Sequence, residues 1–165
     1  MSRSDIKVRE MQFANALLMP KVIKMLNEGH TVTLKLKGRS MRPFLEDDRD
    51  KALLKALNGI KVGDPVLAEV SPDKYVLHRV IRIIGDNVTL QGDGNIGIEN
   101  CRKCDVKGIA IGFYRKGRDI IDSTEDKKWK VYSWIWMRLF PIRRYLLAFY
   151  RIVWLQIFPV RLIKK

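Results

Sequence analysis

The sequence has few of the residues that bind metal ions or form disulfides. Its 165 residues include only two cysteines, Cys101 and Cys104, and two histidines, His30 and His78. A structural zinc site usually takes four Cys or His ligands, and these histidines do not have the spacing of a ligand pair. A zinc site and a disulfide are alternatives, but we expect two reduced thiols, no metal and no cofactor, as in a reducing cytosol.

Acidic residues are missing from the last part of the chain. All 18 Asp and Glu residues precede position 127, whereas 127–165 contains ten Lys and Arg residues, which supply most of the net charge of +14. The four Trp residues lie in the same segment, at Trp129, Trp134, Trp136 and Trp154. Cations among aromatic side chains are typical of helices that lie in the headgroup region of an anionic membrane. We therefore predict that 129–165 binds such a surface or a partner protein.

Long uncharged apolar runs are also absent. The longest run in 129–165 covers nine residues, 152–160, whereas a transmembrane helix needs about 20. Packing on the rest of the chain is a second interpretation of this segment, and a membrane span by 145–163 is a third. The pattern disfavours nucleic acid, because basic and aromatic side chains that bind single strands normally line a groove.

The start of the chain lacks the apolar core of a secretory signal. Charges occur throughout "MSRSDIKVREMQFANALL", so we expect the chain on the cytosolic side, attached peripherally to a membrane. Within an N-terminal helical segment, 1–30, apolar residues at three- and four-residue spacing predict an amphipathic helix over 8–28. Pro20 lies inside it and predicts a kink or a break, and Gly29 is expected to end it.

The period changes to two after residue 30, which indicates β-strands. The segment 31–38 alternates apolar and polar residues, and further strands are predicted at 65–70, 75–84, 88–92 and 106–117. The sequence "KALLKAL" fits a strand or a short helix, and "DGNIGIENCRKCD" is typical of a loop. Six or seven short strands at regular spacing predict a mainly β domain over 31–117, a coiled antiparallel β-barrel or sandwich.

The composition then changes twice more. Residues 118–128 are polar and predict a linker, and 129–165 predict amphipathic helices. Pro141 and Pro159 are expected to divide this tail into two helical segments.

Three polar residues stand at strand ends or inside a strand. Ser40 follows the strand at 31–38, and Asp93 lies between two glycines, so each is by itself typical of a turn. His78 shares a strand face with Val76 and Val80, and such partial burial lowers the pKa of an imidazole. A neutral imidazole is suited to act as a general base near pH 7.

Five stretches of 31–117 resemble a known superfamily in order and spacing. "GRSMRPFLEDDRD", "KVGDPVLAEV", "YVLHRVIRI", "VTLQGDGN" and "VKGIAIGFYRKG" are similar to motifs of the signal peptidases I and the self-cleaving SOS-type repressors. The resemblance implies that Ser40 is a nucleophile. Bacterial members have a lysine base where this chain has His78, and that histidine resembles the endoplasmic-reticulum-type signal peptidases. For that branch the resemblance implies His78 as general base and Asp93 as the residue that orients it.

The remaining residues of the serine motif are expected to contact substrate. The resemblance places Gly38, Arg39, Met41 and Pro43 beside the oxyanion and the substrate, with the Ser40 amide as a candidate oxyanion donor. We therefore expect a serine endopeptidase that cleaves a peptide or protein precursor at a membrane surface. The segment 1–30 is too short for a helix-turn-helix domain, which argues against a repressor.

Two alternatives belong to other classes of protein. A peptide-binding or membrane-associated scaffold would keep the same fold without turnover, and it predicts Ser40 and His78 far apart or His78 without a carboxylate partner. A nucleic-acid-binding regulator predicts steeply salt-dependent binding to DNA.

Overall fold

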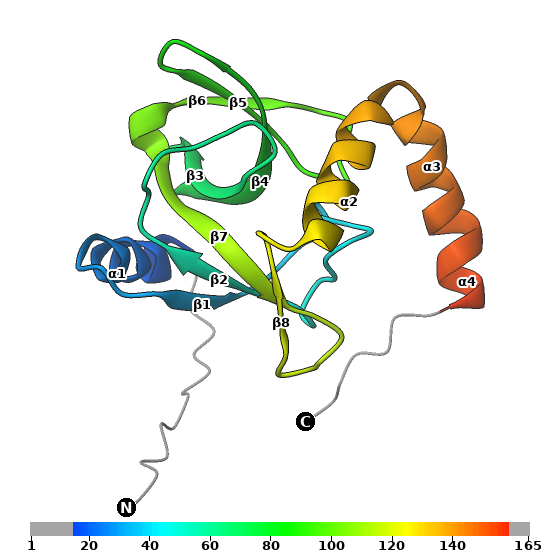
Figure 1. The fold of residues 1–165 in the computed structure, drawn as a ribbon, viewed down its shortest axis with the longest axis horizontal. Helices are drawn as coiled ribbons and strands as arrows, with labels where there is room; N and C mark the ends of the chain where they lie inside the picture. Colours follow the sequence, from blue (N-terminus) through cyan, green and yellow to red (C-terminus); the bar gives the residue numbers. More distant parts are fainter. Residues whose placement is uncertain (1–14, 159–165) are drawn as a thin grey trace, which may run out of the picture.

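The computed structural model describes residues 15–158, and these form a mainly β structure with helices at both ends (Figure 1). One antiparallel sheet contains all the strands: β1 (Val32–Lys35), β2 (Lys51–Lys55), β3 (Pro65–Ser71), β4 (Lys74–Ile84), β5 (Asn87–Gln91), β6 (Glu99–Arg102), β7 (Val106–Tyr114) and β8 (Ile121–Ser123). Their order is β1-β2-β7-β3-β4-β5-β6, and β8 pairs with β7. The sheet is not closed into a barrel. The mainly β prediction is confirmed at this level.

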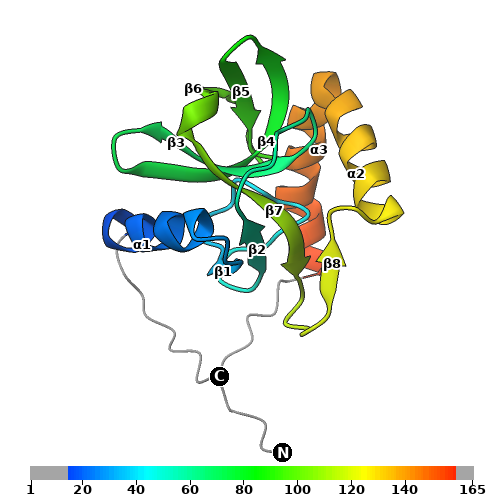
Figure 2. The same ribbon diagram turned by 60° about the vertical axis from the view of Figure 1, so that its left-hand side comes forward.

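The long strand β7 joins the two halves of the sheet. Its first residues pair with β3 through Val66 and Ile109, and its last residues pair with β8 through Phe113 and Asp122. Strand β2 runs along the other edge of β7, with a register shift at Leu53. Because three strands meet β7 in this way, the sheet bends, and Figure 2 shows its two halves facing different directions.

The structure decides between the two interpretations of one segment and corrects the prediction for another. "KALLKAL" contains a strand, β2, because alternate residues are buried there. The predicted loop at 93–105 contains β6, which pairs with β5, and a 3₁₀ turn, Lys103–Asp105. Sequence alone did not indicate β6, because its four residues carry one apolar side chain, that of Cys101.

Helix α1 (Asn15–Asn27) covers the sheet near β1 and β7. Gly29 ends it in a left-handed conformation, φ +86°, and His30 N–H donates to the carbonyl of Met25, as predicted for a glycine after a helix. The expected break at Pro20 is not found, since the helix continues through it. Val22 and Leu26 follow the proline and stay on the buried face, and their packing favours continuation. The predicted start at residue 8 lies outside the described residues.

The apolar core consists of two clusters on the two halves of the sheet. The larger joins α1 to β2, β7 and the segment between β1 and β2, and includes Leu26, Leu45 and Phe113. The smaller lies among β3 to β7 and includes Val66, Val80 and Leu90.

The C-terminal segment forms a helical layer on the side of the sheet opposite α1 (Figures 1 and 2). It consists of α2 (Lys127–Arg138), a 3₁₀ turn (Phe140–Ile142), α3 (Arg143–Phe149), a π-helical turn (Tyr150–Trp154) and α4 (Leu155–Ile157). The predicted division at Pro141 is confirmed, because α2 and α3 meet there and run in opposite directions. Pro159 lies outside the described residues. None of the helices in 15–158 combines the length and apolar character that crossing a bilayer requires.

The segment predicted as a linker is part of the fold. Strand β8 lies within 118–128, and α2 begins at Lys127. Trp129 is buried in the core, with its ring 4.6 Å from that of Phe44 and 5.0 Å from that of Phe113. The sequence did not reveal this because β8 has only three residues, and the middle one, Asp122, is charged.

Candidate active site

Ser40 lies in a turn between β1 and β2. Gly38 precedes it with φ +92°, a left-handed conformation, and its N–H donates to Asp47 Oδ1 at 2.8 Å. Asp50, which is fully buried, accepts from the N–H groups of Glu46 and Lys116 and thereby fixes the rest of this segment. Ser40 itself is partly exposed, and neither its hydroxyl nor its N–H donates to a residue in the described part of the chain. Both groups are therefore available to a ligand.

His78 lies inside β4 and is almost fully buried, with 3% of its surface exposed. Its Nδ1 atom is 2.5 Å from Oε2 of Glu99, the first residue of β6. Neither atom has another partner among residues 15–158. The other oxygen of Glu99 is 3.7 Å from Lys74 Nζ at the surface. A carboxylate at Nδ1 holds the proton on that nitrogen and leaves Nε2 with a free lone pair.

Gly92 brings the Ser40 turn and His78 together. A Cβ atom at this position would lie 3.0 Å from His78 Nε2 and even closer to the carbonyl oxygen of Ser40. That carbonyl also accepts the N–H of Gly94 at 2.7 Å. Residues 92–94 thus bind the Ser40 turn on one side and border the imidazole on the other. Any side chain at Gly92 would push the two apart.

The other predicted motif residues surround the same turn. Met41 is buried and lines a cavity of about 150 Å³, together with Gly38, Ser40, Tyr75 and Leu77. Arg39 is exposed, and its carbonyl lies close to Gly94. Pro43 is partly buried. This cavity lies between the Ser40 turn and the first half of β4.

Asp93 does not contact His78 in the way that the sequence suggested. Its two carboxylate oxygens accept from Arg79, at 2.9 Å from Nε and 2.7 Å from Nη2, and Tyr132 O–H donates to Oδ2 at 3.0 Å. The physical reason is the alternation of β4, which directs His78 and Arg79 to opposite faces. A permanently charged guanidinium is the stronger partner for a buried carboxylate, so Asp93 pairs with Arg79 and leaves Glu99 to His78.

Burial sets the ionisation of the site. Loss of water lowers the pKa of His78 below its ordinary value of 6.5, and the charge of Glu99 offsets this only in part. The imidazole is therefore neutral at pH 7. Burial and the Asp93 carboxylate raise the pKa of Tyr132 well above 10, so that its hydroxyl stays protonated and donates to Asp93.

The C-terminal helices form hydrogen bonds both with the segment that follows β5 and with the turn that carries Ser40. Trp136 Nε1 donates to the carbonyl of Asp93 at 3.1 Å, and Arg143 Nη1 donates to Gln91 Oε1 at 2.6 Å. Tyr150 O–H donates to Glu46 Oε1 at 2.5 Å. These bonds join α2, α3 and the π-helical turn to both segments that carry the site. Packing on the body, one alternative for the tail, is thus observed for one face of it.

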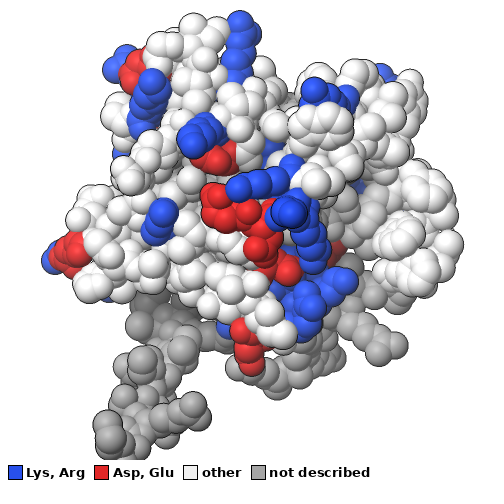
Figure 3. All heavy atoms as spheres, in the orientation of Figure 1, with Lys and Arg blue, Asp and Glu red and all other residues white. Residues whose placement is uncertain are grey.

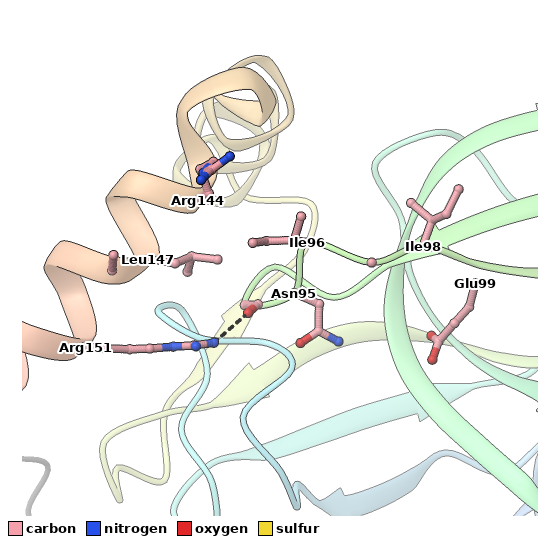
Figure 4. A pocket seen from close by; sticks show the side chains of 10 residues that line it. Asn95, Ile96, Ile98, Glu99, Arg144, Leu147 and Arg151 are labelled. Carbon is pink, nitrogen blue, oxygen red and sulfur yellow. Dashed lines mark hydrogen bonds between the residues drawn. The ribbon is translucent and has the colours of Figure 1, made fainter.

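A second and larger cavity lies beside Glu99, between 94–99 and α3 (Figure 4). Its volume is about 370 Å³, and it is lined by Ile96, Leu147, Arg144 and Arg151 among others. Arg151 Nη2 donates to the carbonyl of Gly94 at 3.3 Å, the bond drawn in Figure 4. The carboxylate that faces His78 therefore also borders a hollow that is open to the outside.

Neither cysteine is bonded to another group by a disulfide. Cys101 is buried and Cys104 is exposed, and both are free thiols. Within residues 15–158 no group of three or more His, Cys, Asp and Glu side chains has an arrangement suited to a metal ion.

A comparison of the chain with models of known protein families finds no match, and a comparison with curated proteins finds none either. The site is therefore interpreted from its own geometry. Sequence reasoning missed Glu99, Arg79 and Tyr132. The available signal for Glu99 was an acidic residue among apolar and small ones in "NIGIEN", six positions after Asp93.

Proposed function

We propose that the chain is a serine endopeptidase of the signal-peptidase-like type, with Ser40 as nucleophile, His78 as general base and Glu99 as the carboxylate that orients it. The observation that carries this proposal is the position of His78. Its Nδ1 faces Glu99 at 2.5 Å, and its Nε2 borders Gly92, against which the Ser40 turn also lies. A coiled antiparallel sheet that brings this turn next to β4 supports the finer assignment of the fold.

The proposed reaction is acyl transfer. Ser40 Oγ attacks the carbonyl carbon of the scissile peptide bond while its proton passes to His78 Nε2. Glu99 stabilises the resulting imidazolium, and the Ser40 N–H is a donor for the oxyanion. The C–N bond then breaks, and the imidazolium gives its proton to the leaving amine. A water molecule attacks the ester in the second half, with His78 again taking a proton and returning it to Ser40.

Substrate binding is supported by the free edge of β4. This strand pairs with β3 from Lys74 to Arg79, but with β5 only from Arg79 onward. Within residues 15–158, Tyr75 and Leu77 therefore have no neighbouring strand on their second side, and both line the 150 Å³ cavity. An extended peptide added at this edge would form main-chain hydrogen bonds and place one side chain of modest size in the cavity. The substrate class is thus an extended segment of a peptide or protein.

Asp93 takes a positioning role in this proposal. Its bonds with Arg79, Tyr132 and Trp136 hold residues 92–94 in place, and Gly92 borders both the Ser40 carbonyl and His78 Nε2. Asp93 does not touch the imidazole itself.

The test is cleavage of a diverse peptide library, read by mass spectrometry of the products. Wild-type protein is expected to cleave a defined subset, and Ser40→Ala is expected to lose this cleavage by a factor on the order of 10³ or more. Ser71→Ala, which removes an exposed hydroxyl from the end of β3, should leave cleavage unchanged. Equal cleavage by Ser40→Ala and wild type would contradict the proposal.

A peptide-binding module without turnover is the second candidate. It is favoured by one observation, the free β4 edge beside a cavity, which requires no chemistry. If the wild type binds library peptides but cleaves none, this candidate replaces the peptidase. Binding that is lost in a Tyr75→Ala variant would place the peptide on β4.

A further inference from the structure

The helical stretch from α3 to α4 is apolar on its outer side as well as on its inner side. Leu147 faces the sheet and is buried, whereas Tyr145, Phe149 and Ile152 are 65%, 56% and 64% exposed. These three follow one another at spacings of four and three, so they lie on one face of the helix. A helix that is apolar all round is normally enclosed by protein or lipid.

Exposed apolar side chains concentrate in this layer. Of the twenty large hydrophobic residues that are exposed in the described part of the chain, twelve lie between Val131 and Phe158. Figure 3 shows the corresponding region, over α3 and α4 on the right-hand side, as mostly white with separate blue groups. We call the exposed residues of 131–158 the helical surface. An apolar area of this kind indicates an interaction site.

The polar side chains of the helical surface are almost all cationic. Apart from the tips of Trp and Tyr, its exposed polar residues are Arg138, Arg144, Arg151 and Gln156. The guanidinium of Arg138 lies 4.0 Å from the ring centre of Trp134, which is 55% exposed. Aromatic rings next to cations match the level of lipid headgroups, where a ring is partly immersed and a cation meets phosphate.

The larger cavity extends this surface across to the sheet. Ile96 and Ile98, 63% and 53% exposed, line it, and Figure 4 shows Ile96 pointing toward Leu147. Apolar side chains of the segment between β5 and β6 thus continue the apolar surface of α3. Arg144 and Arg151 flank the hollow from the helix side.

We propose that the helical surface docks on an anionic lipid bilayer, with Trp134, Phe149 and Ile152 immersed below the headgroups and Arg138 and Arg144 paired with lipid phosphates. Charge complementarity selects this occupant. A second copy of the chain would bring the same cations face to face. A typical protein–protein interface contains about ten direct hydrogen bonds. The helical surface offers few polar groups other than cations to make them. This proposal stands independently of the peptidase.

The orientation has a consequence for the cavity beside Glu99. Because Arg144 and Arg151 line it, docking would place its opening at the level of the headgroups. A peptide anchored in the same leaflet would then lie within reach of the site.

Trp fluorescence of the full-length chain gives a direct test. Trp134 and Trp154 are exposed, whereas Trp129 and Trp136 are buried, so only the first two should respond to lipid. Vesicles of phosphatidylglycerol and phosphatidylcholine are expected to shift the emission to the blue, and lipids brominated near the headgroup should quench it. A Trp134→Phe/Trp154→Phe variant should lose both effects. No shift and no quenching with anionic vesicles would overturn the proposal.

Matched variants separate this surface from general charge and hydrophobicity. Phe149→Ser/Ile152→Ser and Arg138→Gln/Arg144→Gln are each expected to weaken cosedimentation with the anionic vesicles on the order of tenfold or more. The controls Val62→Ser/Ile84→Ser, at residues 52% and 55% exposed, and Arg82→Gln/Lys103→Gln remove similar groups elsewhere. Equal losses in surface and control variants would overturn the proposal, and so would a dimer in solution that buries Trp134.

Discussion

Two neighbouring residues of β4, His78 and Arg79, each face a carboxylate, and the two pairs differ in exposure and in charge. His78 faces Glu99, whose side chain is 28% exposed and borders a cavity. Arg79 faces Asp93, and both of these side chains are 1% exposed. Arg79 is permanently charged, and Asp93 uses both carboxylate oxygens. His78 is neutral at pH 7 because burial lowers its pKa.

The difference teaches how neighbouring residues of one strand can serve chemistry and stability separately. A pair with one titratable member and a carboxylate open to the outside can take up and release a proton. A fully buried guanidinium–carboxylate pair cannot do so near neutral pH, but it fixes the atoms around it. We therefore expect substitutions at the first pair to act on rate, and substitutions at the second to act on the free energy of unfolding.

Glu99→Gln is expected to have the largest effect. The amide keeps the shape but lacks the charge that stabilises the imidazolium, so kcat should fall on the order of 10³-fold. Removal of the carboxylate also removes a cause that raises the pKa of His78. The acid limb of kcat/KM should therefore move to lower pH in the variant. A pH profile of peptide hydrolysis measures both effects.

Glu69→Gln is the matched control, because the Glu69 side chain is also 28% exposed and pairs with a lysine. Its kcat and its pH profile should equal those of the wild type. If Glu99→Gln hydrolyses peptide at the wild-type rate, Glu99 has no part in the reaction.

Arg79→Met is expected to have the second-largest effect, and this effect is on the free energy of unfolding. The variant leaves Asp93 buried without its partner, which should lower the free energy of unfolding by about 3–5 kcal/mol. Urea denaturation, followed by circular dichroism, measures the change. Lys130→Met, which removes one member of an exposed ion pair with Glu125, should change the midpoint little. Comparable losses in the two variants would contradict the structural role of Arg79.

Tyr132→Phe is expected to have a smaller effect on the same pair. It removes one hydrogen bond to the Asp93 carboxylate, which still has Arg79, and should lower the free energy of unfolding by about 1.5 kcal/mol. Tyr145→Phe removes the hydroxyl of a residue that is 65% exposed and should have no measurable effect.

The pH dependence of stability gives the smallest effect. In the unfolded chain His78 binds a proton below about 6.5, whereas the folded state resists protonation because its pKa is lowered. Stability should therefore fall as the pH decreases from 6.5 toward the folded pKa, and it should be unaffected by His78 above that range. A His78→Asn variant should lack this part of the pH dependence. An identical profile in both proteins would show that the pKa of His78 does not change on folding.

Much of the fold could be predicted from the sequence, because its signals are local. Alternation of apolar and polar residues predicted β1, apolar runs between turns predicted β3, β4, β5 and β7, and Gly29 marked the end of α1. Short elements were missed, since β6 has four residues and β8 has three. The β-propensity of so few residues is a weak signal, and nearby glycines and charged residues indicate a loop instead.

The candidate site was only partly predictable. A neutral, buried His78 follows from its apolar neighbours on the strand face. Its partner does not, because the choice between Asp93 and Glu99 depends on which carboxylate Arg79 takes, and that is a matter of three-dimensional packing. The contact of Tyr132 with Asp93 spans 39 positions of the chain and has no local signal.

A ¹⁵N NMR titration of the His78 imidazole in the wild-type protein tests most directly whether His78 is a neutral base. We predict a neutral ring at pH 7 with its proton on Nδ1, toward Glu99, an unprotonated Nε2 on the side of Gly92, and a pKa below 6.5. A ring protonated on Nε2, or a pKa above 6.5, would contradict the assignment of His78 as the base that activates Ser40.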